Sequence, residues 1–253
     1  MEQWKNRVAV VTGASSGIGA AIAKDLVKAG MITIGLARRV DRIEKLKEDL
    51  PKDLGKNLHA LKCDITKENE IIQVFSEIDE KFGGIHVLIN NAGLNMSIGL
   101  IDKANSDRIH QIIDTNILGA IFCTREAYKS MSKHGINSHV IHMNSILGHM
   151  LPLVSDRFNS SIYSASKHAL KVINEVHRQE FIQSKHHIKV SSISPGQVKT
   201  DMSFNVLGIG EKYYSKVPHL QPEDVAQSVL HILGTPPHVQ IHELIIKPFG
   251  ETW

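Results

Sequence analysis

The sequence has few cysteines, no long apolar run and no dense block of one charge. Its 253 residues include only two cysteines, Cys63 and Cys123, whose spacing matches no disulfide or metal pattern and suits reduced thiols. No apolar run approaches the roughly 18 residues that a membrane span needs. The formal net charge of +3 comes without a Lys/Arg block, which gives little support to nucleic-acid binding.

Histidine is abundant but lacks the spacing of a metal site. There is no His-Glu-x-x-His motif, and the adjacent His186 and His187 lie in a polar stretch. We therefore expect solvated or core histidines and no metal. Residues 1–7 show neither a secretory apolar region nor a basic transit segment, so we expect a cytoplasmic protein.

Apolar segments of strand type alternate with amphipathic helical segments along the whole chain. Strands are expected at 7–12, 31–37, 58–62, 87–90, 139–144, 188–193 and 240–246. Helices are expected between the glycine-rich turn and Gly30, and at 40–50, 67–82, 106–134, 163–184 and 222–233. This alternation predicts one doubly wound α/β domain over residues 1–253, with a seven-stranded parallel sheet and helices on both faces.

A glycine-rich segment lies between the first strand and the first helix. It reads Thr12-Gly-Ala-Ser-Ser-Gly-Ile-Gly19, and glycines there let the backbone approach a pyrophosphate at the start of the helix. The spacing departs from G-x-G-x-x-G because position 22 is Ile, and a tight turn between packed elements is the alternative. The cofactor residues predicted here are Gly13, Ser15, Ser16, Gly17, Ile18 and Gly19.

The end of the second strand indicates which dinucleotide is bound. An NAD site would place an acid there for the ribose hydroxyls, but the stretch is Leu36-Ala-Arg-Arg39 and the first acid is Asp41. The guanidinium groups of Arg38 and Arg39 can hold a 2′-phosphate by charge-assisted hydrogen bonds. This favours NADP(H) over the alternative of two solvated charges that open a helix.

Tyr163 and Lys167 are four positions apart on an expected helix and therefore share one face. An ammonium beside the phenol would lower the tyrosine pKa from about 10 and make it a proton donor and acceptor for an alcohol or carbonyl oxygen. Taken alone the spacing is weak evidence, because such pairs are more often a ring edge and a solvated charge. The same helix carries a regular apolar face, made by Ala165, Ala169, Val172, Ile173 and Val176.

Seven motifs in register make the chain resemble the short-chain dehydrogenase/reductase family over nearly its full length. They are Thr12–Gly19 (TGxxxGxG), Cys63–Ile65, Asn90–Gly93 (NNAG), Thr115-Asn116, Asn144-Ser145, Tyr163–Lys167 (YxxxK) and Pro195–Thr200 (PGxxxT). The resemblance implies a Rossmann-type fold and a nicotinamide cofactor that carries the hydride. Within the family, residues 37–39 and 239–243 look like the farnesol-dehydrogenase-like branch, close to cytosolic NADP-dependent ketosteroid reductases.

The resemblance also implies four catalytic residues. Tyr163 would exchange the proton with the substrate oxygen, and Ser145 would stabilise charge that develops on it. Lys167 would lower the tyrosine pKa and hold the nicotinamide ribose, while Asn116 would hold a water against Lys167. Further cofactor contacts are implied for Asp64 and Ile65 near the adenine, for Asn91, Ala92 and Gly93 at its ribose, and for Pro195, Gly196, Val198 and Thr200 at the nicotinamide.

Two apolar loops, 146–162 and 203–218, flank the Tyr163 helix and the last strands. If they line the pocket, the substrate is a small lipophilic alcohol or carbonyl compound, such as an isoprenoid or a steroid. Packing of both loops against their own strands is the alternative. The candidate substrate residues in and beside them are Leu147, His149, Leu153, Phe158, Met202 and Phe204.

These features together predict an NADP(H)-dependent oxidoreductase that interconverts an alcohol and its ketone or aldehyde. One alternative is a catalytically silent NADP-binding regulatory protein, which would not need all four catalytic residues. Another alternative is a same-fold reductase for sugar or acyl-carrier substrates. Such an enzyme would need a more polar entrance to its pocket, or a basic surface patch that binds a carrier protein. The resemblance further implies a homodimer or homotetramer that uses the helices 106–134 and 163–184.

Overall fold

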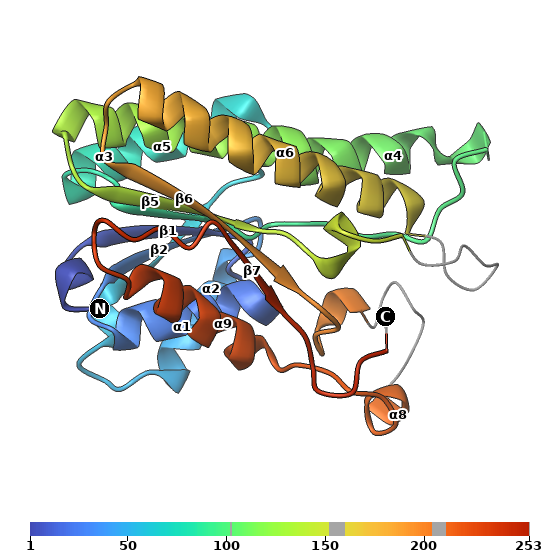
Figure 1. Ribbon diagram of the computed structural model, residues 1–253. Helices are drawn as coiled ribbons and strands as arrows, with labels where there is room; N and C mark the ends of the chain where they lie inside the picture. The colour runs from blue at the N-terminus through green and yellow to red at the C-terminus, as the bar shows by residue number, and fades with distance from the viewer. Residues whose placement is uncertain (102, 152–159, 204–210, 253) are drawn as a thin grey trace.

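The computed structural model describes residues 1–101, 103–151, 160–203 and 211–252, and its centre is a parallel sheet between two helical layers (Figure 1). The strand order is β3-β2-β1-β4-β5-β6-β7. The strands are β1 (Val8–Thr12), β2 (Ile32–Ala37), β3 (Leu58–Lys62), β4 (Val87–Asn90), β5 (Ser138–Met143), β6 (Ile188–Pro195) and β7 (Glu243–Ile246). The order reverses between β1 and β4, which opens a crevice at their carboxyl ends.

Helices cover both faces of the sheet (Figure 1). One face carries α1 (Gly17–Lys28), α2 (Val40–Lys45) and α9 (Pro222–Leu233). The other carries α3 (Glu68–Phe82), α4 (Ser106–Ile113), α5 (Gly119–His134) and α6 (Ser161–Gln183), and a short α8 (Glu211–Tyr214) precedes α9. Among the described helices, none is both long and apolar enough to span a bilayer.

The strands are buried on both sides because their residues alternate between two cores. In β1, Ala9 and Val11 pack with the α1 and α9 layer, whereas Val8 and Val10 pack with the α3 and α5 layer. This explains why the sequence shows continuous β-branched runs rather than an alternating pattern. The predicted seven-stranded, doubly wound parallel sheet is confirmed.

Some predicted boundaries are wrong. The strand expected at 240–246 begins only at Glu243, and β6 continues two residues beyond Ile193. The second half of the helix expected at 40–50 is a 3₁₀-helix, Leu46–Asp49. These ends depend on pairing with neighbouring strands and on terminal hydrogen bonding, which local sequence patterns specify poorly.

The long helix expected at 106–134 is interrupted by a π-helical segment, Asp114–Leu118. Such a segment widens one turn of the helix and is frequent at functional sites. Asn116 lies within it and is buried. The interruption therefore falls at one of the four residues expected to be catalytic.

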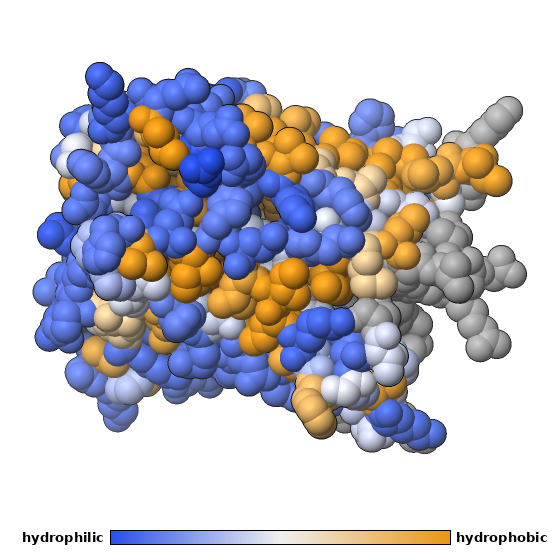
Figure 2. All heavy atoms as spheres, in the orientation of Figure 1, coloured by the Kyte–Doolittle hydropathy of each residue, from blue (hydrophilic) through white to orange (hydrophobic). Residues whose placement is uncertain are grey.

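The apolar face of α6 points largely to solvent. Val172 is 64% exposed and Val176 is 45% exposed, whereas Tyr163 and Lys167 are buried on the side that packs against the sheet. Figure 2 shows apolar side chains among the polar ones along this helix. The regular apolar spacing seen in the sequence therefore does not mark the face that packs inward.

Candidate functional site

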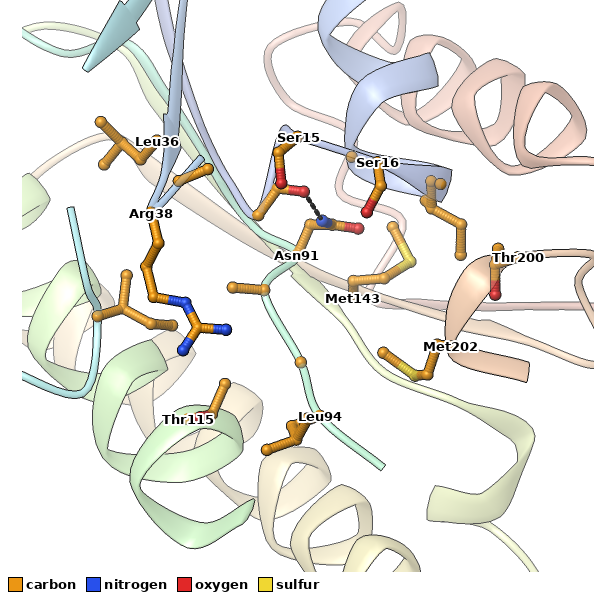
Figure 3. Close-up of a pocket in the computed structure, with 18 of the residues that line it drawn as sticks. Ser15, Ser16, Leu36, Arg38, Asn91, Leu94, Thr115, Met143, Thr200 and Met202 are labelled. Carbon is orange, nitrogen blue, oxygen red and sulfur yellow. Dashed lines mark hydrogen bonds between the residues drawn. The ribbon is translucent and has the colours of Figure 1, made fainter. Parts of the chain in front are cut away.

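A cavity of about 540 Å³ lies in the crevice where the strand order reverses (Figure 3). It runs from the glycine-rich turn to the buried start of α6. Most of the predicted cofactor residues line it: Gly13, Ser15, Ser16, Gly17, Ile18, Gly19, Arg38, Arg39, Asp64, Ile65, Asn91, Ala92, Gly93, Tyr163, Lys167 and Thr200. The other three, Pro195, Gly196 and Val198, line a second cavity of about 320 Å³ beside it.

Thr12 joins the glycine-rich turn to the segment after β4. Its Oγ1 accepts hydrogen bonds from the backbone N–H groups of Asn91 and Ala92, each at 3.0 Å, and Asn91 Nδ2 donates to the Thr12 carbonyl at 2.9 Å. Gly13 has a φ of +69°, and a Cβ there would lie 2.8 Å from Ala92 Cα. Glycine is therefore required where the two segments meet.

The N-terminus of α1 opens toward this cavity. Its N-cap residue, Ser16, makes no side-chain capping hydrogen bond, so the first N–H groups of the helix are not satisfied by a cap. Unpaired N–H groups and the helix dipole favour an anion at this position. The residues therefore fit a pyrophosphate group.

Arg38 and Arg39 directly follow β2 at the rim of the cavity. Both are exposed, and Figure 3 shows the Arg38 side chain reaching into the cavity. No ion pair joins either guanidinium to an acid within the described residues. Their charge is thus available to a phosphate, and its binding there stays a prediction.

The expected catalytic residues gather where the two cavities meet. Tyr163 lines both cavities, Lys167 lines the first and Ser145 lines the second. Asn116 lines neither and lies behind the wall. Its Oδ1 accepts from Leu94 N at 2.8 Å, while its Nδ2 donates to Leu94 O at 3.0 Å and to Ser166 Oγ at 3.0 Å. Asn116 thus fixes the backbone after Gly93 against α6.

Burial sets the protonation of Tyr163 and Lys167. It raises the pKa of Tyr163 to about 12, opposed by a hydrogen bond with Ser145, and it lowers the pKa of Lys167 to about 8. Lys167 Nζ donates to the Met143 carbonyl at 2.7 Å and lies 5.7 Å from the centre of the Tyr163 ring. The ammonium is thus turned to the backbone, and a lowering of the tyrosine pKa by Lys167 stays a prediction.

The structure places only part of the predicted substrate set at the second cavity. Leu147 and Met202 line it, whereas Leu153, Phe158 and Phe204 lie outside the described residues. His149 lines neither cavity because its ring is engaged elsewhere: Nε2 lies 2.9 Å from Ser194 Oγ and 3.2 Å from Glu243 Oε1. Further lining residues that the candidate substrate set did not name include Asn95, Ile146, Gln197 and Tyr213.

Comparison with known proteins gives matches over almost the whole chain. A family model described as short chain dehydrogenase matches residues 7–207. The chain is 48% identical to a farnesol dehydrogenase of Aedes aegypti, over 99% of both proteins. It is 38% identical to human dehydrogenase/reductase SDR family member 11, over 98% of this chain and 96% of that protein. A solved structure of serine dehydrogenase complexed with NADP+ aligns with a TM-score of 0.85 at 27% identity, over 97% of this chain and 96% of that one.

Proposed function

Because the chain belongs to the short-chain dehydrogenase family, we propose that it is an NADP(H)-dependent oxidoreductase that interconverts a lipophilic alcohol and its carbonyl compound. The observation that carries this proposal is the meeting of two cavities at Tyr163. One cavity is lined by the glycine-rich turn and the other largely by apolar side chains. A cofactor in the first would present its nicotinamide, the source or acceptor of hydride, to a substrate in the second.

The preference for NADP(H) rests on the charge at the end of β2. Two guanidinium groups lie there, at a point where an NAD site would place an acid. Asp64, on the neighbouring segment of the rim, accepts hydrogen bonds from the backbone N–H and the hydroxyl of Thr66. The related serine dehydrogenase was solved with NADP+, which agrees with this preference.

We assign proton transfer to Tyr163. At neutral pH, well below the Tyr163 pKa of about 12, the phenol is protonated and can donate to a carbonyl oxygen during reduction. Ser145 lines the same cavity and would donate a second hydrogen bond to that oxygen. Lys167, charged below its pKa of about 8, would offset the negative charge left on the phenol oxygen. That Asn116 also holds a water against Lys167 stays a prediction.

The lipophilic substrate class rests on the walls of the second cavity. Ile146, Leu147, Val198 and Met202 supply apolar surface around the reacting oxygen. A relative at 48% identity is a farnesol dehydrogenase. An isoprenoid alcohol such as farnesol, a steroid or a similar carbonyl compound suits this chemistry.

A cofactor-absorbance screen tests the proposal. NADPH and NADP+ are combined with farnesol, a retinoid, ketosteroids and small diketones, and with sugar polyols as the polar comparison. Turnover on the hydrophobic compounds should exceed turnover on the polyols, because only they gain from burial against apolar walls. Higher activity on the polyols would contradict the lipophilic assignment.

We further propose that the chain forms a homodimer or homotetramer through α5 and α6. The exposed apolar face around Val172 and Val176 would be removed from water by the same face of a second copy, in an isologous contact. Val172→Asp should then yield monomers in light scattering. The free, buried Cys63 and Cys123 fit a reducing compartment, and we propose the cytoplasm.

A further inference from the structure

A third cavity, of about 590 Å³, lies at the amino end of the sheet. Residues at the start of four strands line it: Arg7 before β1, His86 before β4, Ser138 in β5 and Ile188 in β6. Because all these strands are parallel, their amino ends lie at the opposite end of the sheet from the cofactor crevice (Figure 1). The cavity has the size of a small-molecule site, and the proposed function leaves it unused.

The titratable side chains that line this cavity are all basic. They are Arg7, His86, His186, His187 and Lys189, and no Asp or Glu is among the described lining residues. Within the described part of the chain, no ion pair joins Arg7 or Lys189 to an acid. A cavity lined by charge of one sign concentrates ligands of the opposite sign, so this one favours an anion.

The guanidinium of Arg7 keeps its donors for a ligand. Its Nη1 lies 3.3 Å from His86 Nε2, but this contact does not use a donor. His86 Nδ1 accepts from the Val8 N–H at 3.3 Å, so the proton of the neutral ring is on Nε2, which cannot accept from Arg7. Burial lowers the pKa of His86 to about 4, and the ring is therefore neutral at pH 7. An anion in the cavity can accept directly from the guanidinium.

The other basic side chains are supported by neighbouring segments. Lys189 Nζ donates to the Val239 carbonyl at 3.0 Å, so a neutral acceptor fixes its charge at the cavity wall. The His186 ring packs edge-on against Tyr128 of α5, with ring centroids 5.8 Å apart. His187 follows it and is exposed. The positive charges and the imidazole donors thus come from separate segments that converge on one space.

We propose that this cavity is a second ligand site, which binds a small organic phosphate. Arg7 and Lys189 supply two positive charges, which match a phosphate dianion better than the single charge of a carboxylate. Trp4, Ile188 and Pro237 add apolar surface for the organic part of the ligand. Binding there does not depend on the proposed oxidoreductase activity.

Calorimetric titration of the full chain with phenyl phosphate tests the site. Saturating NADP+ keeps the probe from the phosphate positions of the cofactor crevice. The wild type should bind phenyl phosphate with a Kd of about 1 mM or below. Benzoate, with one charge, should bind several-fold more weakly, and the uncharged benzyl alcohol about tenfold more weakly or not at all.

Arg7→Met removes the charge and its donors, so the Kd for phenyl phosphate should rise about tenfold. Lys5→Met is the matched control, because Lys5 is an exposed cation two residues away that does not line the cavity, and it should leave the Kd unchanged. Circular dichroism checks that each variant is folded. His187→Ala, which removes an imidazole donor and should also raise the Kd, carries the test if Arg7→Met does not fold.

A wild type that does not bind phenyl phosphate overturns the proposed site. Equal binding by the wild type and the cavity variants overturns it as well, because the probe then binds elsewhere, including in the cofactor crevice. Equal affinity for benzoate and phenyl phosphate overturns the assignment to a phosphate. None of these results bears on turnover, so the proposed function fails or stands by its own screen.

Discussion

Glu251, in the segment after β7, accepts a hydrogen bond from the backbone N–H of Gln197 at 2.9 Å. Its side chain is only 2% exposed, and its other carboxylate oxygen lies 3.2 Å from Lys247 Nζ. A Cβ at Gly196 would overlap the same carboxylate, which would then have to move away from the loop. The C-terminal segment therefore supports the loop that forms one wall of the second cavity.

Glu251→Ala should destabilise the protein and weaken substrate binding. The variant leaves the backbone N–H of Gln197 without its carboxylate acceptor, which costs about 1–3 kcal/mol of unfolding free energy. A higher KM should accompany this loss, since the loop 195–200 is no longer held. Urea denaturation and steady-state kinetics measure the two effects. Glu77→Ala, which breaks an exposed pair with Lys81, is the control and should lower the unfolding free energy by no more than about 1 kcal/mol. If both variants lose the same unfolding free energy, Glu251 does not support the loop.

Tyr163→Phe should abolish turnover and leave NADPH binding nearly intact. The change removes only the phenol oxygen, and proton transfer by a positioned side chain contributes on the order of 10²–10⁴-fold. The ring that packs beside Lys167 is kept. NADPH fluorescence titration and a turnover assay separate the two effects, with Tyr128→Phe on α5 as the matched control. Turnover near that of the wild type would remove Tyr163 as the proton donor.

Replacing Arg38 and Arg39 with Ala should weaken NADP(H) binding more than NAD(H) binding. Charge-assisted hydrogen bonds to a 2′-phosphate would be lost, at a cost of about 1–3 kcal/mol in NADP(H) affinity alone. Calorimetric titration with both cofactors measures the difference. Arg178→Ala, at a partly buried pair with Glu175 on α6, should leave both affinities unchanged. Equal weakening of both cofactors in the double variant would exclude the phosphate clamp.

The sheet and the cofactor crevice could be predicted because their signals are local. β-branched runs, the glycine-rich turn and the Tyr163–Lys167 spacing each lie within a few residues, and chain order then places them at one edge of a parallel sheet. The close contact of Gly13 with Ala92 follows from the same strand order. Local pattern and global fold agree in this part of the chain.

Features that depend on distant contacts could not be predicted. His149 looked available for substrate, but Ser194 and Glu243, far along the sequence, engage its ring. The pair of Gln197 and Glu251 has no local signature at all. The apolar face around Val172 has a clear helical spacing in the sequence. Only the packing of α6 shows that this face points to solvent and that the other side of the helix faces the sheet.

Lys167 should make the stability of the fold depend on pH in a defined window. Burial lowers its pKa from 10.5 to about 8, so between these values the unfolded chain binds a proton that the folded chain does not. Stability should therefore rise with pH from about 8 toward 10.5, by at most about 1.4 kcal/mol per pH unit. Tyr163 opposes this only above pH 10, because its pKa is raised from 10.0 to about 12 and the folded chain keeps a proton that the unfolded chain loses.

Lys167→Met isolates this contribution, because the variant keeps a long side chain and has no group that titrates at this position. Burial also lowers the pKa of Lys189, but that effect is present in both proteins and cancels in their difference. Urea denaturation at several pH values between about 7 and 10 should show the wild type gaining stability relative to the variant above about pH 8. Parallel stability curves over this range would mean that Lys167 keeps its ordinary pKa in the folded protein.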